Sequence, residues 1–61
     1  MNIPLDKTYY LMLSNYYTKL IEFQPEGYEN FYYRCVIFYK LEKFNLALKD
    51  VNKCLLLNDK F

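Results

Sequence analysis

The 61-residue sequence predicts an all-α fold of three antiparallel helices. Apolar side chains recur at intervals of three and four residues, as on a helix, and not at alternate positions, as on a half-buried strand. Two segments, 24–27 and 42–44, interrupt this pattern, and the first contains the only glycine of the chain next to a proline. Because helices joined by short turns pack as antiparallel neighbours, we expect residues 1–61 to form one domain.

The first predicted helix covers residues 5–23, with Pro4 in its first turn, where proline is tolerated. Its broad apolar face consists of Leu5, Tyr9, Met12, Leu13, Tyr16, Tyr17, Leu20, Ile21 and Phe23. Its opposite face consists of Lys7, Ser14, Asn15, Thr18, Lys19 and Glu22. Leu11 is the one large apolar residue on the polar side. This pattern is typical of an amphipathic helix whose polar face meets solvent.

The second predicted helix, residues 29–41, is apolar nearly all the way round. Its three apolar stripes are Phe31, Cys35 and Phe38; Tyr33, Ile37 and Leu41; and Tyr32, Val36 and Tyr39. A helix that is apolar on several faces is normally covered on several faces. We therefore expect this helix to lie between the other two.

The third predicted helix covers residues 45–57, with Asn45 as its expected N-cap. Its predicted core stripe is Ala47, Leu48, Val51, Cys54 and Leu55, and its predicted solvent face is Asn45, Lys49, Asn52 and Lys53. Leu46, Leu56 and Leu57 lie outside the core stripe. These three leucines predict a contact with another copy of the chain or with a following helical unit.

Composition limits what the chain can do. Hydrophobic residues make up 54% of it and aromatic residues 21%, whereas a domain of this size buries only about 60% of its unfolded surface. We expect either that part of the apolar surface meets a partner or that the chain is one piece of a longer helical array. A net charge of +1 gives no electrostatic basis for binding nucleic acid or an anionic membrane. No apolar run approaches the ~18–20 residues of a membrane span.

The sequence does not predict an enzyme or a cofactor. It contains no histidine, no glycine-rich phosphate loop and no nucleophile at a recognisable spacing from a base. The two cysteines, Cys35 and Cys54, are too few to hold a metal without imidazole ligands. Without a secretory signal they indicate reduced thiols and a cytoplasmic location.

Charged side chains are assigned to the surface. The seven carboxylates, Asp6, Glu22, Glu26, Glu29, Glu42, Asp50 and Asp59, fall on helix surfaces and ends, and we expect solvent around them. Arg34 of the central helix is expected to point toward the first helix. Its stem would pack on aromatic rings and its guanidinium would reach a carboxylate such as Glu22.

Aromatic and small residues also recur at fixed places in a 34-residue period that begins at Tyr28. They are Phe31, Cys35, Phe38, Phe44, Ala47 and Cys54, with Arg34 just before the first small residue. In this pattern residues 28–61 resemble one full tetratricopeptide repeat, and residues 5–24 resemble the second half of a preceding repeat. Glu42 stands where the family has a glycine. The stretch from Lys40 to Lys53 is similar to repeats of the chaperone-binding branch, although the carboxylate clamp of that branch is absent.

The resemblance implies a non-enzymatic module that binds a peptide or a partner protein through the concave face of the repeat. The matching positions in this sequence are Glu29, Tyr32, Val36, Tyr39 and Lys40. Three of these positions, Tyr32, Val36 and Tyr39, are the third apolar stripe of the central helix. That stripe was identified from periodicity, without reference to the family. Two alternatives remain open at this point. The rings could simply cover the small core, or the chain could be a structural unit whose only partner is a second copy of itself.

Overall fold

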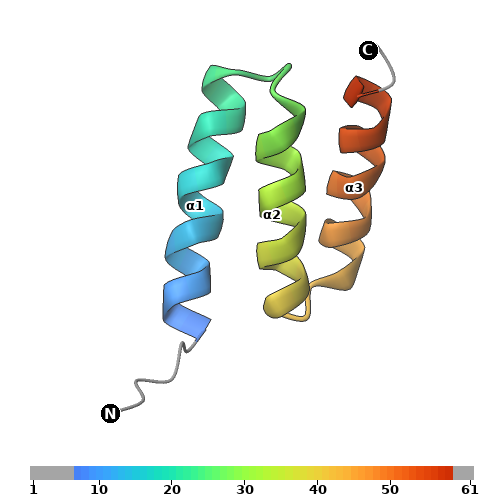
Figure 1. The fold of residues 1–61 in the computed structure, drawn as a ribbon. Helices are drawn as coiled ribbons and strands as arrows, with labels where there is room; N and C mark the ends of the chain where they lie inside the picture. The colour runs from blue at the N-terminus through green and yellow to red at the C-terminus, as the bar shows by residue number, and fades with distance from the viewer. Residues whose placement is uncertain (1–6, 59–61) are drawn as a thin grey trace.

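The computed structural model describes residues 7–58, which form three helices. They are α1 (Lys7–Phe23), α2 (Tyr28–Lys40) and α3 (Phe44–Asn58) (Figure 1). The prediction of an all-α fold is confirmed, because the described residues contain helices and turns and no strand. The second and third helices each lie within one residue of their predicted bounds. Pro4 and the predicted helix start at residue 5 fall outside the described residues, as do Asp6 and Asp59.

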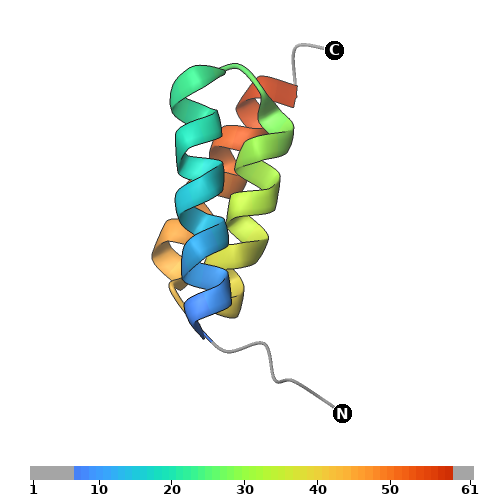
Figure 2. The same ribbon diagram turned by 90° about the vertical axis from the view of Figure 1, so that its left-hand side faces the viewer.

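Consecutive helices run in opposite directions, and α2 lies between α1 and α3 (Figure 1). Within the described helices, no Cα atom of α1 comes within 8 Å of a Cα atom of α3. A second view shows that the three axes do not lie in one plane, because α2 stands to one side of α1 while α3 passes behind (Figure 2). The expected central position of the second helix is confirmed.

The buried apolar core of the described residues is small. It consists of Phe31, Ile37, Leu41, Ala47 and Cys54. The central helix and the residue after it supply the three large side chains, and α3 supplies two small ones. Small residues at a helix contact let the two backbones approach closely, so the α2–α3 pair is the better packed half of the molecule.

The predicted core stripe of α3 is partly wrong. Ala47 and Cys54 are buried, but Leu48 is 58% exposed and Leu55 is 61% exposed. The face that meets α2 is centred on Ala47, Asp50 and Cys54, which share one side of the helix at intervals of three and four. The predicted stripe was therefore displaced around the helix, because it left out the acidic residue at the centre of the buried face.

The predicted polar face of α1 is also partly wrong. Ser14 is 6% exposed and is the buried residue of α1, whereas Met12, Tyr16 and Phe23 of the predicted apolar face are exposed. The Ser14 hydroxyl donates a hydrogen bond to the carbonyl of Leu11 at 2.8 Å. A hydroxyl whose hydrogen bond is made within its own helix can be buried at little cost, so a small polar residue faces α2 in place of a large apolar one.

The turn between α2 and α3 carries a strained residue. Glu42 has φ of 61°, in the left-handed region that glycine adopts at lower cost. The Glu42 amide donates to the Tyr39 carbonyl at 2.9 Å, and the Lys43 amide donates to the Phe38 carbonyl at 2.8 Å. This pair of hydrogen bonds is the Schellman ending of a helix, which normally places glycine where Glu42 stands.

Replacing Glu42 by glycine should therefore stabilise the fold. We expect the free energy of unfolding to rise by about 0.5–1 kcal/mol, because relief of left-handed strain exceeds the added entropy of glycine in the unfolded chain. The measurement is urea denaturation followed by circular dichroism. Glu42→Ala is the matched control, since it removes the charge but keeps the strain. Equal stability of the glycine and alanine variants would show that the turn is not strained.

Candidate functional site

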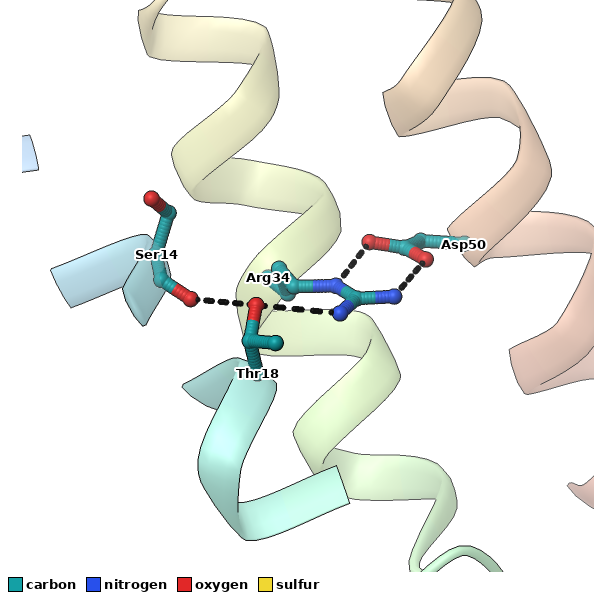
Figure 3. Close-up of polar contacts among 4 residues, drawn as sticks. All are labelled: Ser14, Thr18, Arg34 and Asp50. Atoms are coloured by element: carbon teal, nitrogen blue, oxygen red, sulfur yellow. Dashed lines mark hydrogen bonds and ion pairs between the residues drawn. The ribbon is translucent and has the colours of Figure 1, made fainter. Parts of the chain in front are cut away.

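The polar centre of the molecule is a network built on Arg34. Its Nε donates a hydrogen bond to Oδ2 of Asp50 at 2.8 Å, and its Nη2 donates to Oδ1 of the same carboxylate at 2.8 Å. On the other side, its Nη1 donates to the Thr18 hydroxyl at 3.1 Å, and that hydroxyl donates to the Ser14 carbonyl at 2.7 Å. The guanidinium of α2 thus reaches both neighbouring helices (Figure 3).

The expected packing of Arg34 is confirmed in part. Its guanidinium carbon lies 5.7 Å from the ring centroid of Phe31 and 5.4 Å from that of Phe38, so it does contact aromatic rings. The expected carboxylate was wrong, because the partner is Asp50 of α3 and not Glu22 of α1. The hydrogen bonds that Arg34 donates to Asp50 raise the pKa of Arg34, and burial opposes them only in part.

The solvated position expected for Asp50 was wrong as well, because this residue is 4% exposed. Its two oxygens meet the fork of Arg34 in a bidentate pair, the strongest common geometry for these groups. One signal in the sequence could have revealed that Asp50 is buried. Asp50 lies three residues after Ala47 and four before Cys54, on the face that those two small residues mark as buried.

This network joins α2 to both of its neighbours and leaves none of its own buried polar atoms without a partner. Among residues 7–58, every buried side-chain nitrogen or oxygen has a hydrogen-bond partner, and no cluster of carboxylates and thiols could hold a metal ion. Cys35 and Cys54 are free thiols. Burial, with smaller contributions from Asp50 and Cys54, raises the pKa of the Cys35 thiol, which is the opposite of what a reactive cysteine needs.

The five residues predicted to bind a partner lie on the exposed side of α2. Tyr32 is 52% exposed and Tyr39 is 64% exposed, with Val36 between them, and Glu29 and Lys40 are exposed near the two ends of the helix. Neither ring is buried, and the alternative that the rings simply cover the small core stays open. Their role in binding stays a prediction.

Further aromatic rings extend this row onto the neighbouring helices. Ring centroids of Tyr16 and Tyr17 are 5.1 Å apart, those of Tyr17 and Tyr33 are 5.5 Å apart, and those of Tyr32 and Tyr33 are 5.7 Å apart. At the other end, the rings of Tyr39 and Phe44 are 5.4 Å apart. We name the surface formed by Tyr16, Tyr17, Tyr32, Tyr33, Val36, Tyr39 and Phe44 the aromatic band. Sequence reasoning missed four of its members, because the contacts that join the three helices, Tyr17–Tyr33 and Tyr39–Phe44, cross between helices.

The second predicted surface, on α3, is exposed in part. Leu46 and Leu56 are exposed, whereas Leu57 is half-buried. Lys49 and Lys53 lie on the exposed side of the same helix. Because the one carboxylate of α3 is buried against Arg34, the charge that this helix presents to solvent is basic. An open hollow of ≈ 380 Å³ adjoins its start and is lined by Glu42, Lys43, Phe44, Asn45 and Leu46.

Comparison with known proteins gives no match, whether to protein-family models, to curated proteins or to solved structures. None of the helices within residues 7–58 combines the length and the apolar character needed to cross a membrane. The functional interpretation therefore depends on the geometry of the aromatic band and of α3.

The buried ion pair generates a stability prediction. Replacing Asp50 by alanine leaves the guanidinium of Arg34 largely buried without its carboxylate, which should lower the free energy of unfolding by about 3 kcal/mol. Glu22→Ala, at the carboxylate favoured by the sequence, should change it by less than about 0.5 kcal/mol. Both values come from urea denaturation.

A double variant separates the ion pair from simple loss of packing. Arg34→Met combined with Asp50→Leu should recover much of the lost stability, since apolar groups of similar size can replace a buried pair. If Asp50→Ala cost no more than Glu22→Ala, the network would not hold the helices together.

Proposed function

We propose that this chain is a non-enzymatic protein-interaction module, similar to a tetratricopeptide repeat, that binds a segment of a partner protein on its aromatic band. The observation that carries the proposal is the exposed row Tyr32, Val36 and Tyr39 on the central helix. Although α2 packs against both neighbours, this row stays exposed, with the Tyr39 ring against Phe44 at the start of α3. A single domain with this surface acts by binding, without a cofactor.

The chemistry of the band suits a protein partner. Tyrosine combines a large apolar ring with a hydroxyl that can make hydrogen bonds, so it is enriched where protein interfaces form. A few aromatic side chains near the centre of an interface typically carry most of its binding energy. Net charge and the absence of a basic patch on the band favour a polypeptide over nucleic acid.

Rigidity of the support also favours this role. The side of α2 opposite the row is fixed by the bidentate bond from Arg34 to Asp50 and by the burial of Phe31 and Ile37. Binding groups placed on a rigid helix lose less freedom when a ligand arrives. The free thiols Cys35 and Cys54 support our further proposal that the protein is cytoplasmic.

The direct test is selection of peptides from a random phage-displayed library against the folded chain, followed by measurement of their dissociation constants. We expect Tyr39→Ala to raise the dissociation constants of the selected peptides at least tenfold, because a central ring of the interface is lost. Helicity measured by circular dichroism should stay nearly unchanged. Tyr9→Ala is the matched control, since Tyr9 is an exposed tyrosine outside the band. Unfolding of Tyr39→Ala, or selected peptides that bind it as well as the native chain, would contradict the proposal.

A second candidate function is self-association through α3, and the exposure of Leu46 and Leu56 favours it. Exposed leucines on the outer helix of a stack can be covered by another copy of the same chain. In this case the protein would be a structural unit with no separate ligand.

Self-association predicts a dimer or larger species at tens of micromolar, measured by sedimentation equilibrium. The double variant Leu46→Lys and Leu56→Lys should be monomeric, because burying two added ammonium groups opposes contact. Leu11→Lys, at an exposed leucine of α1, is the control and should leave the mass unchanged. A monomeric mass for the native chain at millimolar concentration would exclude this candidate.

A further inference from the structure

The spacing of rings along α2 limits the shape of a ligand that could contact them all. Tyr32 and Tyr39 are seven residues apart, which is about 10 Å along a helix that rises 1.5 Å per residue. One turn of polyproline II, three residues of 3.1 Å each, advances about 9 Å and returns a side chain to the same face. In a β-strand, residues three apart point to opposite faces, so a strand cannot place both on the rings.

The shape of the surface also favours a ligand that is ordered before it binds. The α2 part of the band is an exposed helix face, and a hollow opens at its edge beside Phe44. A shallow contact yields little binding energy, so a flexible ligand would lose much of it to ordering. Polyproline II segments are already extended in solution and dock on surfaces lined with aromatic rings.

The charges at the two ends of α2 have opposite signs, so a complementary ligand would carry a basic residue at one end and an acidic residue at the other. Glu29 and Lys40 are exposed near opposite ends of α2, and neither forms an ion pair within the described part of the chain. They are eleven residues apart, or about 16 Å along the helix. The row between them carries no exposed charge, because the guanidinium of Arg34 is directed to Asp50. Five residues of polyproline II also span about 16 Å.

We infer that the aromatic band takes a proline-rich segment in the polyproline II conformation, with a basic residue at Glu29 and an acidic residue five positions away at Lys40. The inference rests on the proposed function and adds the chemistry of the ligand. Proline rings pack on Tyr32 and Tyr39 one turn apart, and the two end charges align the segment with α2.

The probe is the blocked hexapeptide Lys-Pro-Pro-Pro-Pro-Glu, titrated into the folded chain labelled with nitrogen-15 and followed by NMR. We expect amide shifts that cluster on α2 and saturate in the millimolar range. The matched peptide Lys-Ala-Ala-Ala-Ala-Glu should bind at least fivefold more weakly, since it lacks both the prolines and their conformation. Tyr39→Ala should weaken the proline peptide about tenfold, and Tyr9→Ala should not.

A charge exchange tests the end assignments without touching the rings. Lys40→Glu should weaken the binding of Lys-Pro-Pro-Pro-Pro-Glu several-fold. It should strengthen the binding of Lys-Pro-Pro-Pro-Pro-Lys by a similar factor. Because Lys40 also favours the negative end of the helix dipole, circular dichroism of the variant confirms that helicity is retained. Unchanged preference between the two peptides would overturn the charge assignment and with it the inference.

The outcomes distinguish a failure of the inferred ligand chemistry from a failure of the proposed binding surface. If library peptides bind on α2 without proline, or as amphipathic helices, or if the alanine peptide binds as well as the proline peptide, the inference is overturned and the proposed function stands. Shifts confined to α3 would overturn the inference in the same way. If neither the hexapeptide nor any selected peptide perturbs α2, the proposed function itself fails.

Discussion

The bidentate bond between Arg34 and Asp50 is the interaction on which the arrangement of the three helices depends. The apolar core of the described residues is small, and α1 and α3 do not approach each other closely. Arg34 joins them through α2, because its guanidinium meets Asp50 on one side and the Thr18 hydroxyl on the other. Breaking a buried ion pair is far more costly than its net contribution suggests, since the remaining charge is left without a partner.

The same bond determines which side of α2 is available to a partner. Arg34, Phe31 and Ile37 occupy the packed side of the helix, so the opposite side is left with Tyr32 and Tyr39. Burying Asp50 also removes the acidic charge from the outer surface of α3 and leaves it basic. The absence of charge from the aromatic band and the basic outer surface of α3 therefore both result from the bond between Arg34 and Asp50.

The features that could be predicted from the sequence are those that depend on the pattern of residues within one helix. Helix bounds, the central place of α2 and the exposed row all follow from periodicity within one helix. Spacing within α3 could place Asp50 on the buried face with Ala47 and Cys54, but it could not identify the partner, which lies sixteen residues away on another helix. Ser14 was misplaced because its hydroxyl bonds within its own helix, which lets a polar residue be buried. The contact between the rings of Tyr17 and Tyr33, which joins the α1 part of the band to the α2 part, crosses between helices and could not be predicted in this way.

Exchange of the Arg34 Nε proton with solvent, followed by NMR, tests the central claim most directly. A guanidinium that donates to a buried carboxylate opens only when the α2–α3 contact opens, so we expect this proton to exchange far more slowly than that of free arginine. It should also show a nuclear Overhauser contact to the β-protons of Asp50, and the Nη1 protons should show one to Thr18 of α1. Exchange at the rate of free arginine in the folded chain would contradict the account.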